Sequence, residues 1–244
     1  MSERITGRKN PLLQQVRKLL SSKKYRYETG LFVADGTKLL AEALRWWPNV
    51  ETVILSDGVQ MDVPDQVRLV YVPEDVMEYI SPMQTPQGAL FICRLPEETA
   101  FSPKPGMLLL DGIQDPGNMG TILRTADALQ IPVALLEGCA DPYSHKVVRA
   151  SMGAVFRTPV VQTTWQQVEK SVISVAVTAL SDRAMDIRSA PLKDYAIVIG
   201  SEGQGVRREI MDAAAAELII PMDQRCESLN AAIAAAIVMW QMKQ

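Results

Sequence analysis

The sequence MLLLDGIQDPGNMGTILRTADAL (107–129) changes within a few residues from an unbroken apolar run to a helical pattern. MLLLD predicts a buried strand, Pro116 and Gly117 turn the chain, and a helix begins near Asn118, a favourable N-cap residue. Continuous apolar strands that alternate with helices are typical of a parallel sheet buried on both faces, with ligands at the carboxyl ends of the strands. We therefore predict an α/β domain over residues 106–244. The other apolar runs of this sheet are VALL (133–136), ISVAVTAL (173–180), AIVIG (196–200) and ELII (217–220).

Residues 1–95 predict a second, smaller α/β domain. Its β-branched and apolar runs indicate strands, and two segments, 38–47 and 74–80, have a helical pattern. Three prolines and several polar residues in RLPEETAFSPKPG (94–106) are typical of a linker, which we place at 96–105. The expected strands are LFVA (31–34), TVIL (52–55), VRLVYV (67–72) and GALFIC (88–93).

The charge of the chain is unevenly distributed. The whole sequence carries a net charge of −3, but residues 1–26 hold eight Lys/Arg against one acid, a net charge of +7. Such a run is often only the solvated face of a helix, but here Tyr25 and Tyr27 lie among the basic residues and could stack on bases. This segment therefore indicates an RNA-binding arm. Its candidate contacts are Arg8, Lys9, Lys23, Lys24 and Arg26.

The cysteines argue against a metal site or a disulfide framework. Cys93, Cys139 and Cys226 are widely spaced, and His145 is the single histidine. The longest apolar run, 231–240, is too short to span a bilayer, and no signal-peptide pattern opens the chain. We expect a cytoplasmic protein without a metal.

The first polar loop and the helix that it opens, DGIQDPGNMGTILRTADAL (111–129), allow two interpretations. In the structural one, Asn118 caps a helix, and Arg124 and Asp127 form a solvated helical pair. In the functional one, Asn118, Thr121 and Arg124 lie about one turn apart and project together over the strand ends.

The second loop, VIGSEGQGV (198–206), follows a strand and has glycines that permit close approach of the backbone. It lacks the Lys-Ser/Thr of a Walker loop and the third glycine of a dinucleotide loop. Because Glu202 would repel a phosphate, the loop suits a cation or a ribose hydroxyl. The alternative is an ordinary tight turn.

The third loop, IIPMDQRCESLN (219–230), leads into the alanine-rich helix AAIAAAIVMWQ, which Ser228 could cap. This helix is apolar nearly all round, so we expect it at a close helix or subunit contact. Asn230 either satisfies backbone groups or holds a partner from one of the other two loops.

Taken together, NMGTILRTADAL, GSEGQGV and IPM followed by ESLNAAIAAAI resemble, in order and spacing, the three motifs of the SpoU (TrmH-like) family. DPYSHKVVRASMGAVFRTPV (141–160) and the N-terminal segment 10–40 also look like family stretches. Two positions differ from the family pattern. Asp35 stands where a glutamate is usual, and His145 stands where a proline is more frequent.

The resemblance implies a SPOUT-type α/β fold with a C-terminal trefoil knot, a homodimer, and methylation of a ribose 2′-hydroxyl in rRNA or, second, tRNA with S-adenosylmethionine. A general topology rule would not predict a knot. By the family pattern, Arg124 is the catalytic arginine, and Asn118, Glu202, Ser228 and Asn230 accompany it. The cofactor positions fall on Gly200, Gly203, Ile220, Met222 and Leu229.

A guanidinium is almost always protonated, so Arg124 is a poor general base. We expect it to grip a substrate phosphate and to stabilise the developing alkoxide, while the proton passes to a phosphate oxygen or to water. A non-catalytic RNA-binding protein with the same fold is the alternative. A base methyltransferase of the superfamily would be expected to show a different motif set.

Overall fold

The computed structural model describes residues 3–97, 101–158, 160–201, 203–223 and 225–244. The chain folds into two compact units. Unit 1 comprises Met1–Glu97 and Tyr143–Arg157, and unit 2 comprises Glu98–Pro142 and Thr158–Gln244. The first boundary between the units lies between residues 97 and 98, and residues 143–157, predicted to belong to the C-terminal domain, are part of unit 1.

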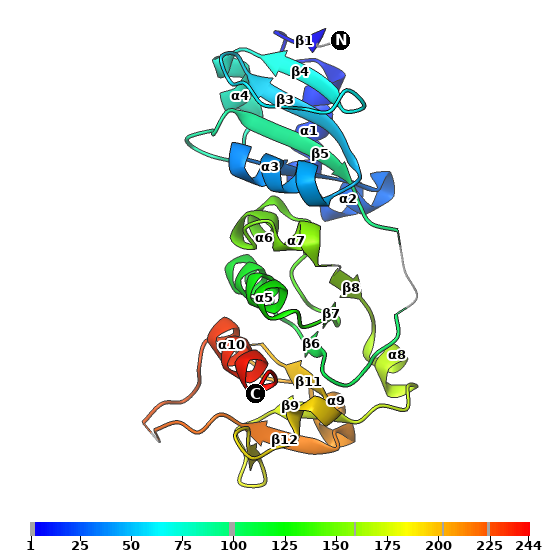
Figure 1. The fold of residues 1–244 in the computed structure, drawn as a ribbon, viewed down its shortest axis with the longest axis vertical. Coiled ribbons are helices and arrows are strands. Elements are labelled where there is room, and N and C mark those ends of the chain that lie inside the picture. The colour runs from blue at the N-terminus through cyan, green and yellow to red at the C-terminus, as the bar shows by residue number, and fades with distance from the viewer. Residues whose placement is uncertain (1–2, 98–100, 159, 202, 224) are drawn as a thin grey trace. The chain divides into compact units, whose positions relative to one another are not determined.

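Unit 1 is a five-stranded mixed sheet with helices on its faces (Figure 1). The strand order is β1-β4-β3-β5-β2, in which β3 and β4 are parallel and β5 is antiparallel to both β2 and β3. The elements are β1 (Glu3–Arg4), α1 (Pro11–Ser21), α2 (Lys23–Thr29), β2 (Leu31–Asp35), α3 (Thr37–Trp46), β3 (Val50–Ser56), β4 (Arg68–Val72), α4 (Glu74–Ile80), β5 (Ala89–Arg94), α6 (His145–Ala150) and α7 (Ala154–Arg157).

The basic arm is part of this unit and forms two helices. Asn10 caps α1 by accepting the N–H of Leu12, and Gly30 ends α2 in the left-handed region with φ 66°. The apolar face of α1 is fully buried against β2 and the neighbouring strands. Its basic residues therefore lie on a helix that the core holds in place.

Aromatic packing explains why residues 143–157 join unit 1. The ring of Phe32 on β2 lies 5.1 Å from that of Tyr143 and 6.4 Å from that of Phe156. The ring of Trp47 lies 5.9 Å from that of Phe156. Phe32, Tyr143 and Phe156 are buried, and Trp47 is partly buried. Apolar contacts therefore hold α6 on β2 and α7 on α3.

Unit 2 contains a seven-stranded sheet of order β10-β12-β9-β11-β6-β7-β8, in which every described pairing is parallel. The elements are β6 (Leu108–Leu110), α5 (Pro116–Leu129), β7 (Val133–Leu135), β8 (Val160–Gln162), α8 (Trp165–Glu169), β9 (Val175–Thr178), β10 (Met185–Asp186), the 3-10 helix η1 (Leu192–Asp194), β11 (Ala196–Ile199), α9 (Arg208–Ala213), β12 (Ala216–Ile219) and α10 (Ala231–Gln241).

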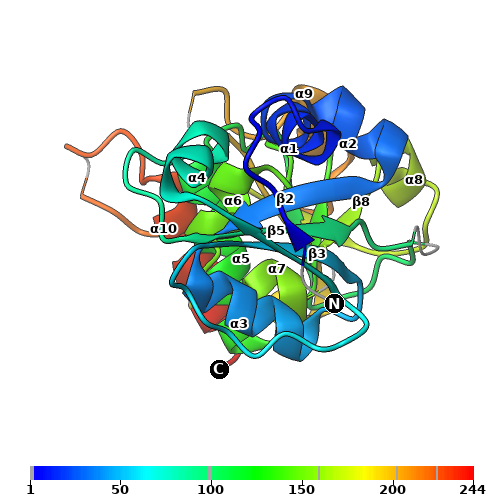
Figure 2. The same ribbon diagram turned by 90° about the horizontal axis from the view of Figure 1, so that it is seen from above.

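The sheet of unit 2 is covered on both faces, as its apolar runs predict. Leu109, Val177 and Val198 share a core with residues of α8 and α9. Alternate strand residues point to the opposite face, where α5 and α10 pack side by side (Figures 1 and 2). After β12 the chain therefore returns over the strand ends to reach α5.

The expected parallel sheet is confirmed, and two short edge strands, β8 and β10, extend it. Two predicted helix caps were wrong. Asp115, not Asn118, caps α5, because Pro116 occupies the first helical position and the Asp115 side chain accepts the N–H of Asn118 at 2.8 Å. Asn230, not Ser228, caps α10. In the part of the chain that the structure describes, no helix is long and apolar enough to cross a membrane.

Candidate active site

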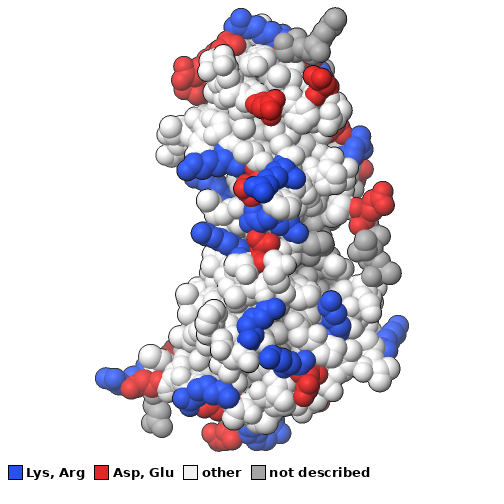
Figure 3. All heavy atoms as spheres, in the orientation of Figure 1, with Lys and Arg blue, Asp and Glu red and all other residues white. Residues whose placement is uncertain are grey.

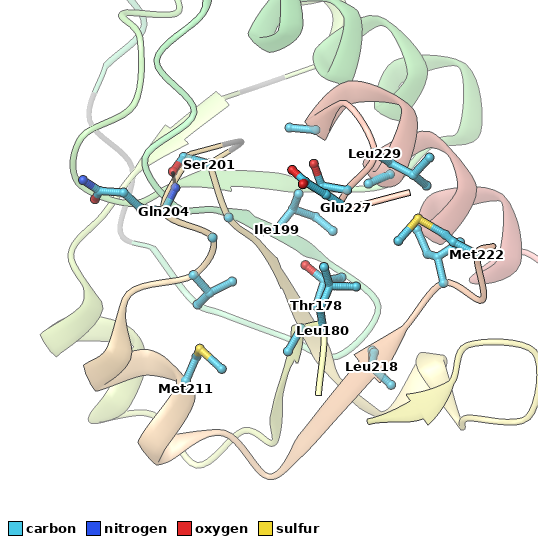
Figure 4. A pocket seen from close by; sticks show the side chains of 18 residues that line it. Thr178, Leu180, Ile199, Ser201, Gln204, Met211, Leu218, Met222, Glu227 and Leu229 are labelled. Carbon is cyan, nitrogen blue, oxygen red and sulfur yellow. Dashed lines mark hydrogen bonds between the residues drawn. The ribbon is translucent and has the colours of Figure 1, made fainter. Parts of the chain in front are cut away.

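A cavity of about 460 Å³ lies at the carboxyl ends of β9, β11 and β12. Thr178 ends β9 and lines the cavity, as do Ile199 and Gly200 at the end of β11. In Figure 4, Ser201 and Gln204 lie on one side of this space, and Met222 and Leu229 lie on the other. A ligand site at the strand ends is what the sheet predicts, and the volume suits a small cofactor.

The second loop forms one wall of the cavity through its backbone. Ser201 and Gly205 exchange two backbone hydrogen bonds, of 3.1 and 2.9 Å, which close the loop. A Cβ at Gly200 would overlap the backbone of Gly205 and Val206, so only glycine fits there. Of the two predicted cofactor positions in this loop, Gly200 lines the cavity, whereas Gly203 is exposed and is not part of its wall. Glu202 lies outside the described residues.

The third loop and the start of α10 form the opposite wall. Ile220, Met222, Ser228 and Leu229, four of the predicted site residues, line the cavity. Glu227 lines it as well, which the sequence did not predict. It is the single charged side chain among the described lining residues, and Figure 4 shows it beside the open space.

A hydrogen bond connects this wall to the first loop. The side-chain oxygen of Asn230 accepts the N–H groups of Ala232 and Ile233, and its Nδ2 donates to Oδ1 of Asn118 at 3.0 Å. Both interpretations of Asn230 therefore hold in the structure, since it caps its helix and also binds a partner from another loop. Capping fixes the orientation of the amide that reaches Asn118.

Arg124 lies on the exposed side of α5, two turns beyond Asn118. The opposite side of the helix is buried, including Ile122 and Leu123, so the core fixes which side faces outward. No hydrogen bond or ion pair joins Arg124 to another described residue, and Asp127 bonds Thr158 instead, at 2.7 Å. The expected helical pair of Arg124 and Asp127 is thus not present.

An ion cluster around the buried Asp111, which the sequence did not predict, lies behind the second loop. Asp111 is 1% exposed and accepts the backbone N–H of Arg207 at 2.9 Å and its Nε–H at 2.7 Å. The same guanidinium donates to Glu137 at 2.7 Å and to Glu209 at 3.0 Å. The only sequence signal was an aspartate directly after an apolar strand.

Charge pairing in this cluster outweighs burial. Burial by itself would raise the pKa of Glu137, but hydrogen bonds from its own backbone and from Arg207 lower it overall. Burial would likewise lower the pKa of Arg207, but its bonds to Glu137 and Asp111 raise it. Burial raises the pKa of the nearby Cys139 thiol to about 11, which keeps it protonated at neutral pH.

The candidate RNA contacts in unit 1 have different environments. Lys9, Lys23 and Lys24 are exposed, and the Lys23 ammonium lies 5.7 Å from the ring centre of Tyr27. Arg8 is exposed and pairs with Asp75 at 3.0 Å. The predicted RNA contact at Arg26 is not supported, because this residue is only 5% exposed and its guanidinium donates to the carbonyl of Leu19 at 2.6 Å. On the face drawn in Figure 3, basic side chains occur on both units with acidic ones among them.

The two positions that depart from the family pattern are partly or fully buried in unit 1. Burial raises the pKa of Asp35, although the nearby Arg149 opposes this shift. Burial lowers the pKa of His145, and the positive charges of Lys146 and Arg26 add to the effect. His145 is therefore neutral at physiological pH.

A buried parallel sheet with a ligand-sized cavity at its strand ends is the architecture of an α/β enzyme that binds a small cofactor. Residues 105–240 match the SpoU rRNA Methylase family, and residues 10–90 match the MRM3-like substrate binding domain. The chain belongs to the SpoU rRNA methylase family. It is therefore an S-adenosylmethionine-dependent RNA methyltransferase with a SPOUT-type fold, which confirms the fold, the activity and the cofactor that the resemblance implied.

Known proteins resemble the chain along nearly its full length. It is 30% identical to the 23S rRNA (guanosine(2553)-2′-O)-methyltransferase RlmP of Bacillus subtilis, over 99% of each chain. A putative RNA methyltransferase of the TrmH family from Porphyromonas gingivalis superposes with a TM-score of 0.84 at 33% identity, over 95% of this chain and 96% of that one. An AdoMet-bound rRNA methyltransferase from Sinorhizobium meliloti superposes with a TM-score of 0.86 at 29% identity, over 99% and 97%.

Proposed function

We propose that this protein methylates the 2′-hydroxyl of a ribose in ribosomal RNA. The hydrogen bond between Asn230 and Asn118 carries the proposal, because it joins the cavity wall to the helix that presents Arg124. The elements that would hold the methyl donor and the acceptor are thereby connected. The Bacillus subtilis relative is named for 2′-O-methylation of 23S rRNA, which supports ribosomal RNA rather than transfer RNA.

The cavity suits S-adenosylmethionine in its chemistry. Its wall is mostly apolar, as the adenine ring requires, and Gly200 lets the backbone approach closely. The negative charge of Glu227 complements the sulfonium, which supplies an electrophilic methyl group when the cofactor is bound. In this proposal the cofactor-binding residues are Gly200, Ile220, Met222 and Leu229, with Glu227 added and with Gly203 left out because it does not line the cavity.

Arg124 binds and orients the RNA in this mechanism. Its guanidinium stays protonated and forms two hydrogen bonds to a phosphate, which places the ribose hydroxyl toward the methyl donor. It also stabilises the negative charge that develops on the 2′-oxygen, while the proton leaves to a phosphate oxygen or to water. Asn118 and Asn230 hold the two loops together. Ser228 and Glu202 complete the proposed set.

Replacement of Arg124 by Lys tests this role, because it keeps the charge and removes the planar fork. We expect single-turnover methyl transfer to rRNA to fall by about 100-fold or more, with the affinity for S-adenosylmethionine unchanged. Arg208→Lys is the matched control, since that side chain is 92% exposed on α9. A near-normal rate for Arg124→Lys would contradict the mechanism. Failure of the wild-type protein to bind the cofactor would instead favour a non-catalytic RNA-binding protein.

Unit 1 binds the RNA backbone in this proposal. The exposed cations Lys9, Lys23 and Lys24 lie on or before its first two helices, and Tyr27 is 40% exposed beside Lys23. Arg8 completes the set, whereas Arg26 is excluded because it is buried. Phosphate contacts from such residues make binding depend on salt.

Charge reversal of Lys23 and Lys24 tests the RNA surface. We expect weaker binding to rRNA fragments, and a slope of log affinity against log salt that falls by about one for each lost contact. Reversal of Lys170 and Lys193, two exposed lysines of unit 2, is the matched control. An unchanged slope for the Lys23/Lys24 variant would exclude these two residues from the RNA contacts.

The proposal includes a homodimer and a knotted C-terminal segment. Membership of the SpoU family supports a trefoil knot in this segment. Exposed apolar residues on α10 support the dimer, whose test is given in the Discussion. The proposal also includes a cytoplasmic location, which the bacterial rRNA methyltransferase relative supports.

A further inference from the structure

Asp111 is tied to both ends of the second loop. Its backbone N–H donates to the carbonyl of Ile199 at 2.9 Å, directly before the loop begins at Gly200. Its carboxylate accepts the backbone N–H and the Nε–H of Arg207, directly after the loop ends at Val206. One buried residue thus fixes the separation of the two stems of a cofactor-binding loop.

Glu137 completes the arrangement from the neighbouring strand. It follows β7, and its carboxylate accepts a hydrogen bond from Nη2 of Arg207 at 2.7 Å and another from the backbone N–H of Trp165 at 3.3 Å. Its own carbonyl accepts the N–H of Gly112 at 3.2 Å. Asp111 is buried, and a buried carboxylate is tolerated only when its hydrogen bonds are satisfied, whereas the side chains of Arg207 and Glu137 are 36% and 39% exposed. The bonds that Arg207 makes to Asp111 and Glu137 therefore constrain the position of its guanidinium.

We infer that the Arg207 clamp, formed by Asp111, Glu137 and Arg207, positions the Gly200–Val206 loop for the cofactor and thereby sets the affinity for S-adenosylmethionine. The inference rests on the proposed function and adds positioning residues to it. None of the three side chains lines the cavity, whereas Gly200, Ser201, Gln204, Gly205 and Val206 do. The clamp acts through the backbone of these residues.

The loop needs such a clamp because its own contacts are few. Ser201 and Gly205 close it with two hydrogen bonds, and its middle residues Gly203 and Gln204 are exposed. Without the bonds to Asp111, the loop would sample other conformations, and the cofactor would bind only the fraction that remains competent. The apparent affinity for the cofactor would fall in proportion to the competent fraction, even if every direct contact with the cofactor were kept.

Asp111→Asn is the decisive variant. The amide keeps the shape of the side chain but offers an N–H where the carboxylate accepts one from Arg207, so one bond becomes a donor–donor contact. We expect the dissociation constant for S-adenosylmethionine, measured by calorimetry well below the melting transition, to rise at least about tenfold. Amide hydrogen exchange should become faster over residues 200–206, since the loop opens more often.

Glu209→Gln is the matched control, because Glu209 also pairs with Arg207 but lies on the exposed side, at 3.0 Å from Nη1. It should bind the cofactor within about twofold of the wild type. Arg207→Lys is a second variant in case Asp111→Asn does not fold. It keeps the backbone bond to Asp111 and one positive charge, and it should give an intermediate affinity.

A folded Asp111→Asn protein with wild-type affinity would overturn the inference, even if its melting temperature were lower, because the cluster would then only stabilise the fold. Equal losses in Asp111→Asn and Glu209→Gln would overturn it as well. Absence of cofactor binding by the wild type would contradict the proposed function instead, so the two failures are distinguishable.

Discussion

Replacement of Trp240 by Ala should dissociate the proposed dimer. Ile233, Ile237 and Trp240 are 52%, 37% and 61% exposed, and their spacing of four and three residues places them on one side of α10. The opposite side, with Ala235, Val238 and Met239, is buried and faces α5. The exposed stripe is therefore available to a second copy of the chain.

The expected effect follows from the exposed area of Trp240. A tryptophan side chain can bury about 200 Å², so an exposed fraction of 61% leaves roughly 120 Å² to cover, worth about 3 kcal/mol. A two-fold axis presents the residue twice, so complete burial contributes up to about 6 kcal/mol per dimer. Even half of this amount raises the dissociation constant of the dimer by about 100-fold.

Sedimentation velocity over a range of concentrations measures this constant for the wild type and the variant. Trp46→Ala is the matched control, because Trp46 is 48% exposed on α3 of unit 1, outside the stripe. We expect Trp240→Ala to dissociate at concentrations where the wild type and Trp46→Ala remain dimeric. A wild type that is monomeric throughout, or a Trp240→Ala protein with unchanged association, would refute the dimer interface.

Three further predictions concern the cavity and the buried charges. Gly200→Ala should abolish the calorimetric signal of S-adenosylmethionine, because the added Cβ overlaps the Gly205 backbone, whereas Gly7→Ala, with nothing within 4 Å, should bind normally. Glu227→Gln should weaken the binding of S-adenosylmethionine by about two- to fivefold, as expected for an exposed charge pair. The binding of S-adenosylhomocysteine, which lacks the sulfonium, should stay nearly unchanged. Equal losses of affinity for the two ligands would show that Glu227 contacts a group common to both. Asp35→Asn should raise the melting temperature at pH 7, because the neutral amide avoids the cost of burying an ionised carboxylate. Because burial raises the pKa of Asp35 in the folded chain, the ionised side chain destabilises the fold above that pKa, and the advantage of Asn should disappear as the pH falls toward 3.8. A pH-independent difference in melting temperature would contradict this reasoning.

The sheet of unit 2 was predictable because its central strands are buried on both faces and read as continuous apolar runs. The edge strands β8 and β10 were missed because their sequences, VVQ and MD, do not form the continuous apolar run that identified the equally short β6 and β7. The helix caps were missed for a different reason. Asp115 before Pro116 was a better start signal than Asn118, and the rule for proline at the first helical position would have identified it.

Site residues were predictable where they follow strands, since parallel strands bring their carboxyl ends together. Asn118 and Asn230 are 112 residues apart and still meet. The Arg207 clamp was not predictable, because its residues carry no motif and become partners only when β6, β7 and α9 are placed. Arg26 shows the same limit, since a basic residue in a basic run gives no sign that it will be buried against the carbonyl of Leu19.

In the proposed site, the wall that would bind the cofactor is preformed, whereas the position of Arg124, which would bind the RNA, is not fixed by other side chains that the structure describes. The cofactor wall is fixed before any ligand arrives, by Gly200, by the Ser201–Gly205 bonds and by the buried carboxylate of Asp111. Arg124 has no hydrogen-bond or ion-pair partner among the described residues and lies on the exposed side of α5. In the proposed mechanism, this guanidinium donates two hydrogen bonds to an RNA phosphate. We therefore expect cofactor binding to be independent of RNA, whereas the alignment of Arg124 requires the substrate itself.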